Sequence, residues 1–148
     1  MKDYTLKVTA RALIVKNRQL LLVTNDYKIW HTPGGHLEPS EILPDCMVRE
    51  VKEETGLDVK PNQIVYVSDF FDKKYNVHKV EVYFSAKVCV DELPEHWLDQ
   101  GGPVKTSQFF DLESLKGMHV VPSFLKKGKW LSFDLDVYQG SESGSLVF

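Results

Sequence analysis

Residues 33–57 constrain the fold of this chain more than any other segment. They open with a Pro-Gly-Gly break, and Pro44 then fits the first turn of a helix, where its missing N–H costs little. The helix expected over residues 44–55 stops at Gly56, because glycine readily adopts the left-handed conformation of a helix cap. Whatever fold the chain adopts has to accommodate this loop and its capped helix.

Strand-like runs flank the expected helix on both sides. Residues 5–16 and 19–24 are rich in Leu, Val and Ile around a turn at Asn17-Arg18, which predicts a hairpin. Residues 63–71 and 78–90 predict a second hairpin with a polar loop. Many strands with few helices indicate an α/β or α+β layered domain, in which helices pack on a sheet core.

The last third of the chain is less regular. Residues 91–105 are polar and rich in Pro and Gly, which predicts a long surface loop. A short strand at 108–110, a turn of helix at 112–115 and a helical segment at 121–127 are expected next. The run GSESGS near the end predicts a flexible tail.

Length and composition limit the classes of protein. With 148 residues, 43% of them hydrophobic, the chain fits one domain over 1–148 that can bury a core. A net charge of -3 without basic clusters argues against binding to polymeric nucleic acid. We find neither a signal peptide nor 18 uninterrupted apolar residues, so we expect no membrane segment and a cytoplasmic protein. Cys46 and Cys89 lack metal-site spacing and are expected to be buried, reduced thiols.

Three acids concentrate on the expected helix. Glu50, Glu53 and Glu54 stand at i, i+3 and i+4, so their side chains share one face. Like charges at this spacing destabilise an isolated helix by about 0.2–0.5 kcal/mol per pair, and the helix dipole adds to that near the C-terminal end. One interpretation is a solvated charged face. The other is a site for Mg²⁺ or Mn²⁺, which prefer carboxylate oxygens and work with phosphate substrates.

The order of residues distinguishes these interpretations. Gly35, five residues, Glu41, seven residues and then the run Arg49-Glu50-Val51-Lys52-Glu53-Glu54-Thr55-Gly56-Leu57 match every fixed position of the pattern G-x5-E-x7-R-E-U-x-E-E-x-G-U, with U aliphatic. The segment therefore resembles the Nudix box. The resemblance implies an α/β/α sandwich around a mixed sheet, with the box forming a loop, a helix and a loop. It also implies Mg²⁺- or Mn²⁺-dependent hydrolysis of a nucleoside diphosphate linked to another moiety.

The resemblance also implies roles for individual residues. Glu50 and Glu54 correspond to metal ligands, and Glu53 corresponds to a further ligand or to the group that activates water. The carbonyl of Gly34 corresponds to another metal ligand. The resemblance leaves open which glutamate is the general base.

The remaining positions of the box correspond to supporting residues. Glu41 and Arg49 would support the loop and orient the carboxylates, which makes Arg49 part of the catalytic group together with Glu50 and Glu53. Gly35 and Gly56 would permit the loop and the end of the helix.

One feature departs from many Nudix enzymes, which carry an extra acid shortly before a late strand. Residues 103–106 contain no acid. Four acids elsewhere could substitute, although we expect a surface role for each of them because acidic side chains are mostly exposed. They are Glu81, Glu92, Glu95 and Asp99.

The sequence leaves the substrate-binding residues unknown. Aromatic residues that could stack on a base are more often core residues in strands. These are Trp30, Phe70, Phe71, Tyr75 and Tyr83. Tyr75 lies where diadenosine-polyphosphate hydrolases of the family carry a tyrosine, whereas residues 71–74 lack the proline of the ADP-ribose subgroup.

We expect a small nucleotide as the ligand, and the resemblance is compatible with a homodimer. The alternative function is a non-catalytic Nudix-fold module that senses nucleotides or binds protein. The complete box argues against it, because a protein that only binds does not need three acids and Arg49 at the spacing of the catalytic motif. An unrelated acidic-helix protein would not explain the Pro-Gly-Gly loop at its fixed distance.

Overall fold

A computed structural model describes residues 3–89, 92–133 and 136–144. Its first sheet has the strand order β10-β6-β7-β1-β5. Pairing is parallel for β1 with β7 and for β10 with β6, and antiparallel for β6 with β7 and for β1 with β5, so the sheet is mixed. The strands are β1 (Thr5–Leu13), β5 (Gly34–His36), β6 (Val59–Asp72), β7 (Val77–Val88) and β10 (Tyr138–Gly144).

The second sheet has the order β2-β3-β4-β9, and β8 pairs with β3. Asn17 and Arg18 both have positive φ, of 52° and 60°, and form the predicted tight turn between β2 and β3. The expected single strand over 5–16 is therefore divided between the two sheets. The strands are β2 (Val15–Lys16), β3 (Gln19–Thr24), β4 (Ile29–His31), β8 (Thr106–Phe110) and β9 (His119–Val121).

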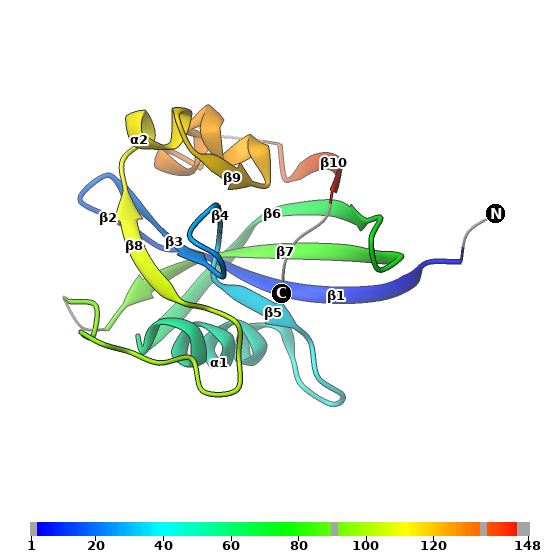
Figure 1. The fold of residues 1–148 in the computed structure, drawn as a ribbon, viewed down its shortest axis with the longest axis horizontal. Helices are drawn as coiled ribbons and strands as arrows, with labels where there is room; N and C mark the ends of the chain where they lie inside the picture. The colour runs from blue at the N-terminus through cyan, green and yellow to red at the C-terminus, as the bar shows by residue number, and fades with distance from the viewer. Residues whose placement is uncertain (1–2, 90–91, 134–135, 145–148) are drawn as a thin grey trace.

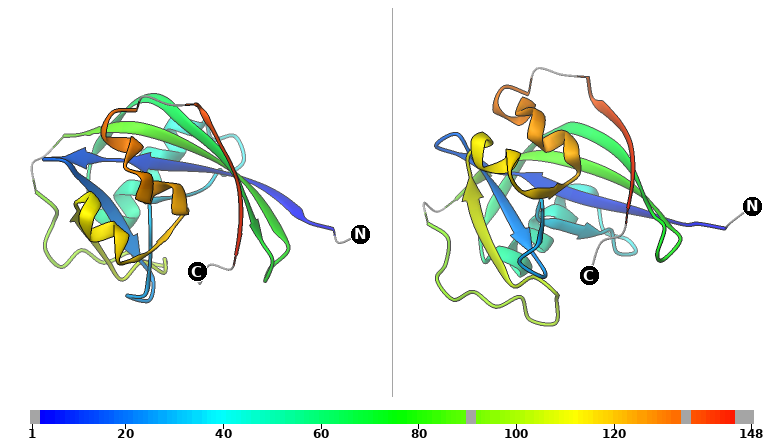
Figure 2. Two further views of the ribbon diagram at one scale, coloured as in Figure 1. Left: turned by 90° about the horizontal axis from the view of Figure 1, so that it is seen from above. Right: turned by 45° about the horizontal axis from the view of Figure 1, so that its top comes forward.

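Helices cover both sides of this curled sheet structure. Figures 1 and 2 show α1 (Leu43–Thr55) on one side, and α2 (Leu112–Lys116) with the 3-10 helices η1 (Ser123–Lys127) and η2 (Lys129–Leu131) on the other. This arrangement confirms the expected mixed sheet flanked by helices. Among the described residues we find no helix with both the length and the apolar character needed to cross a membrane.

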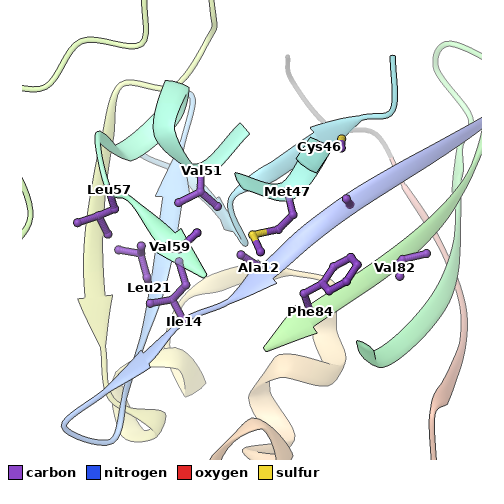
Figure 3. Packing of buried hydrophobic residues seen from close by; sticks show 11 residues of the cluster. Ala12, Ile14, Leu21, Cys46, Met47, Val51, Leu57, Val59, Val82 and Phe84 are labelled. Carbon is purple, nitrogen blue, oxygen red and sulfur yellow. The ribbon is translucent and has the colours of Figure 1, made fainter. Parts of the chain in front are cut away.

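Two hydrophobic clusters hold the layers together. The first packs Cys46, Met47 and Val51 of α1 against strand residues that include Ala12 and Phe84, as Figure 3 shows. The second lies under the short helices, where Trp130 is 1% exposed and its indole N–H donates to the Leu125 carbonyl. Because the buried face of α1 carries its apolar residues, its acids must lie at the edge of the first cluster.

The structure corrects three further expectations. Residues 140–144 of the predicted flexible tail belong to β10, because their backbone pairs with β6. The expected helix over 121–127 is the 3-10 helix η1, preceded by strand β9. Cys46 is buried as expected, but Cys89, which directly follows the last residue of β7, is exposed.

Candidate active site

The three acids of α1 share one face of the helix but differ in exposure. Glu54 is buried, with 8% of its surface exposed. The side chains of Glu50 and Glu53 are 17% and 49% exposed. Burial raises the pKa of Glu54 well above its usual value and also raises that of Glu50. The helix thus presents a graded set of carboxylates, from a desolvated one to a solvated one.

Arg49 binds the acids on both sides of it. Its Nε and Nη2 donate to the two carboxylate oxygens of Glu41 at 2.7 and 2.9 Å, a bidentate pair. Its Nη1 donates to Glu50 Oε1 at 2.9 Å and to both oxygens of Glu53 at 3.4 Å. The hydrogen bonds from Arg49 lower the pKa of Glu41 to about 2. One planar guanidinium therefore fixes the loop acid and two of the helix acids relative to one another.

The two glycines of the loop allow close approach to the acids. The N–H of Gly34 donates to Glu54 Oε2 at 3.1 Å. A Cβ on Gly34 would lie 2.3 Å from the Ala10 carbonyl oxygen, and a Cβ on Gly35 would lie 2.4 Å from the carboxylate carbon of Glu50. Any side chain at either position would displace the neighbouring strand or the carboxylate.

Arg11 is a site residue that the sequence analysis missed. Its Nη1 donates to the carbonyls of Thr32 and Gly34 at 3.2 Å each, and its Nη2 lies 3.4 Å from Glu81 Oε1. Glu81 also accepts a hydrogen bond from the Tyr83 hydroxyl at 2.7 Å. Glu81 is 4% exposed, so the surface role expected for it is wrong. The signal in the sequence is a single charge between Ala10 and Ala12 in an otherwise apolar stretch.

A cavity of about 360 Å³ joins these groups, and residues of both sheets line it. Its wall includes Glu50, Glu53 and Glu54 of α1, Gly34 and Gly35 of β5, Arg11 of β1 and His31 of β4. The structure thus brings together the predicted metal ligands and Gly35, while Glu41 and Arg49 support them from the side. Gly56 lies at the end of the helix, where it forms the left-handed cap with φ 78°.

The loop of residues 92–105 supplies one further acid to this cavity. Asp99 lines the cavity and is partly buried, and its negative charge raises the pKa of Glu54. Burial raises the pKa of Asp99 as well. Glu92 and Glu95 are exposed and do not line the cavity, in agreement with the expected surface role. Asp99 departs from that expectation.

The donor set fits a hard divalent cation by its chemistry, because carboxylate and main-chain carbonyl oxygens are the ligands that Mg²⁺ and Mn²⁺ prefer. Within the described ranges, no three His, Cys, Asp or Glu side chains form a group already arranged to hold a metal ion. Glu50 and Glu53 both point an oxygen at Arg49 Nη1, which satisfies part of their charge.

The aromatic residues proposed for stacking are largely structural. Tyr83 and Phe70 are buried, with 0% and 4% of their surface exposed. Trp30 packs edge-on against Phe110. Tyr75 is 56% exposed in the β6–β7 turn and does not line the cavity.

Comparison with known proteins identifies the family. The sequence model of the NUDIX domain matches residues 5–129, so the chain belongs to the NUDIX domain family. It is 32% identical over 112 residues to the ADP-ribose pyrophosphatase of Methanocaldococcus jannaschii, covering 73% of this chain and 63% of that protein. It is also 32% identical over 87 residues to the human 8-oxo-dGDP phosphatase NUDT18, covering 59% of this chain and 22% of that protein.

Solved structures share the fold. The MutT protein of Methanosarcina mazei superposes with a TM-score of 0.69 at 22% identity, covering 90% of this chain and 96% of that one. This likeness confirms the Nudix fold that the box implies. Because the chain spans 63% and 22% of the two curated relatives, their activities do not transfer to it directly.

Proposed function

We propose that the chain is a metal-dependent hydrolase that cleaves the pyrophosphate linkage of a nucleoside diphosphate joined to another moiety. One observation carries the proposal: Glu50, Glu53 and Glu54 line the same cavity as the Gly34 loop, and Arg49 orients two of these carboxylates. The names of the curated relatives, an ADP-ribose pyrophosphatase and an 8-oxo-dGDP phosphatase, support the same class of reaction.

We assign Glu50, Glu54 and the Gly34 carbonyl to hold Mg²⁺ or Mn²⁺, and Glu53 either to hold the cation with them or to activate the attacking water. Such a cation, when bound, neutralises the charge of the pyrophosphate and makes water easier to deprotonate. Glu53 is the most exposed of the three carboxylates. When it activates water, Glu53 acts as the general base that accepts the proton of the attacking water. Asp99 is the second candidate for this role because it lines the same cavity. Asp99, in the same loop, would then replace the acid that many Nudix enzymes carry and that residues 103–106 lack.

Arg11 supports this site from strand β1. It donates to the Thr32 carbonyl and to the Gly34 carbonyl, and the second of these is itself a proposed metal ligand that has one further lone pair for a cation. The positive charge of the buried Arg11 guanidinium also favours the ionised form of Glu54, which burial alone disfavours. We infer that Arg11 offsets part of the free-energy cost of ionising this innermost acid.

A phosphate- and nucleotide-release assay tests the proposal. The panel contains ADP-ribose, nucleotide sugars, oxidised and normal nucleoside di- and triphosphates, dinucleoside polyphosphates and coenzyme A, each with Mg²⁺ and with Mn²⁺. ADP-ribose is tested first because one relative is named an ADP-ribose pyrophosphatase. Residues 71–74 lack the proline of the ADP-ribose subgroup, so the other compounds are tested beside it. We expect turnover of at least one compound, abolished by EDTA. Binding of a nucleotide without turnover would instead favour the non-catalytic module.

A further inference from the structure

The 92–105 loop is attached to the C-terminal end of α1 by Trp97. The indole N–H donates to the backbone carbonyl of Glu53 at 2.8 Å. Carbonyls in the last turn of a helix have no partner within the helix, so this hydrogen bond satisfies one of them from outside. Trp97 is also 39% exposed, a large apolar side chain that lies on the surface beside the candidate site.

Gly56 provides the space in which the indole lies. A Cβ on Gly56 would lie 2.6 Å from two atoms of the Trp97 ring and 2.9 Å from Pro94. Lys52 Nζ lies 5.6 Å from the ring centroid and also donates to the Gly56 carbonyl at 3.2 Å. Gly56 therefore serves two functions, since its φ of 78° caps α1 and its missing side chain admits the loop.

Hydrogen bonds within the loop hold Asp99 just beyond Trp97. The N–H of Val104 donates to Asp99 Oδ2 at 3.1 Å, and the N–H of Gly102 donates to the Asp99 carbonyl at 3.2 Å. A Cβ on Gly102 would lie 2.3 Å from the Asp99 carboxylate. The loop turns tightly around this acid, and Trp97, two residues earlier, fixes the turn against the helix that carries the other acids.

We propose that Trp97 is a positioning residue that fixes the 92–105 loop on α1, so that Asp99 faces Glu53 and Glu54 in the cavity. This inference rests on the proposed function. The carbonyl that Trp97 binds belongs to Glu53 itself, so the indole connects the backbone of a helix acid to the loop that carries Asp99. The competing role is a surface on which a substrate base stacks, because part of the ring is exposed.

Two substitutions and the double variant that combines them separate these roles by steady-state kinetics. Trp97→Phe keeps an aromatic ring but removes the N–H donor, Asp99→Asn removes the acid, and the double variant combines them. Loss of one hydrogen bond predicts that Trp97→Phe lowers kcat by about 3- to 10-fold with KM changed by less than about 2-fold. In the Asp99→Asn background the same change should alter kcat by less than about 2-fold, because the two residues act together.

Hydrogen–deuterium exchange supplies a test that does not depend on activity. Amides of residues 99–104, including that of Val104, should exchange at least about 5-fold faster in Trp97→Phe and in Trp97→Ala than in the wild type. Leu98→Ala is the matched control, since Leu98 is the adjacent residue and is 75% exposed. We expect it to leave both the exchange and kcat unchanged.

The outcomes that overturn the proposal are distinct. Unchanged exchange in both Trp97 variants, or additive effects on kcat, would show that Trp97 does not act through Asp99. A rise in KM with kcat unchanged would make Trp97 a substrate contact. If the wild type turned over nothing in the panel, the proposed function would fail, while the exchange measurement would still decide the role of Trp97. If Trp97→Ala did not fold, the Trp97→Phe data would decide.

Discussion

At the scale of single residues, Glu54 is the acid whose environment is least favourable to its charge. It is 8% exposed, and burial raises its pKa well above the usual value near 4.5. Ionisation of this carboxyl group in the folded state is therefore unfavourable to stability. A group with a raised pKa contributes to the free energy of unfolding below its unfolded-state pKa. This contribution is lost as the pH rises through the folded-state pKa. Such a residue is kept at a cost in stability, which is typical of functional sites.

Glu54→Gln should consequently separate stability from activity. We expect kcat to fall by at least ~100-fold, the scale of losses at metal-site and acid–base groups. The melting temperature should rise at pH 7–8 without added metal, and the difference from the wild type should vanish near pH 4. The amide can still accept the Gly34 hydrogen bond. Wild-type turnover in this variant at ordinary Mg²⁺ would exclude Glu54 as a ligand.

Arg49 is expected to act through geometry. Its guanidinium reaches Glu41 by two hydrogen bonds and Glu50 by a third, a pattern that an ammonium group cannot reproduce. Arg49→Lys should lower kcat more than it raises KM, because misplaced carboxylates cost transition-state stabilisation. Steady-state kinetics measure both parameters. A large rise in KM with kcat unchanged would instead place Arg49 in contact with substrate.

The fixed spacing of the box was sufficient to predict which acids gather, and the structure places Glu50, Glu53 and Glu54 on one cavity. Arg11 and Glu81 could not be found in this way. They lie 70 positions apart and meet because β1 and β7 pair in parallel, with Thr9 opposite Glu81. A pair of this kind depends on strand register, which local patterns do not contain.

At the scale of secondary-structure elements, the C-terminal end of α1 is where the helix, its cap and the 92–105 loop meet. Gly56→Ala should lower the free energy of unfolding by at least about 1 kcal/mol, since alanine is strained at positive φ and its Cβ would collide with Trp97. Urea unfolding measures this change. The loss should be smaller in a Trp97→Ala background, because the collision is then absent.

Gly117→Ala is the matched control. Gly117 follows α2 at a φ of -94°, and a Cβ there would meet nothing within 4 Å. We expect this substitution to be neutral or slightly stabilising. An equal loss of stability in the two variants would show that neither the left-handed cap nor the contact with Trp97 governs the effect at Gly56.

Elements with strong local signals were predicted well, and those that depend on pairing were not. α1 begins within one residue of the expected position and ends at the expected glycine, because proline and glycine mark its ends locally. β10 was missed because GSESG has the composition of a flexible segment, and only the edge of β6 makes it a strand. The expected strand over 5–16 divides at Ile14, which lies between β1 of the first sheet and β2 of the second.

At the scale of the whole molecule, the candidate site lies where the two sheets, α1 and the 92–105 loop meet. Arg11 and Gly34 come from the first sheet, His31 from the second, the acids from α1 and Asp99 from the loop. A ligand that binds several of these elements together binds the folded state and has no equivalent site in the unfolded chain. The stability of the whole fold should therefore depend on the concentration of that ligand.

We accordingly predict that millimolar Mg²⁺ or Mn²⁺ raises the melting temperature and that EDTA reverses the rise. A cation at about 100 times its dissociation constant stabilises the native state by about 2.7 kcal/mol, which corresponds to a shift of several degrees for a domain of this size. The shift should shrink in Glu50→Gln, which removes one proposed ligand. It should persist in Glu113→Gln, a control that removes an acid of α2 paired with Lys116. A melting curve indifferent to metal, even with a substrate analogue present, would favour the non-catalytic module, because carboxylates that bind no cation cannot support the proposed hydrolysis.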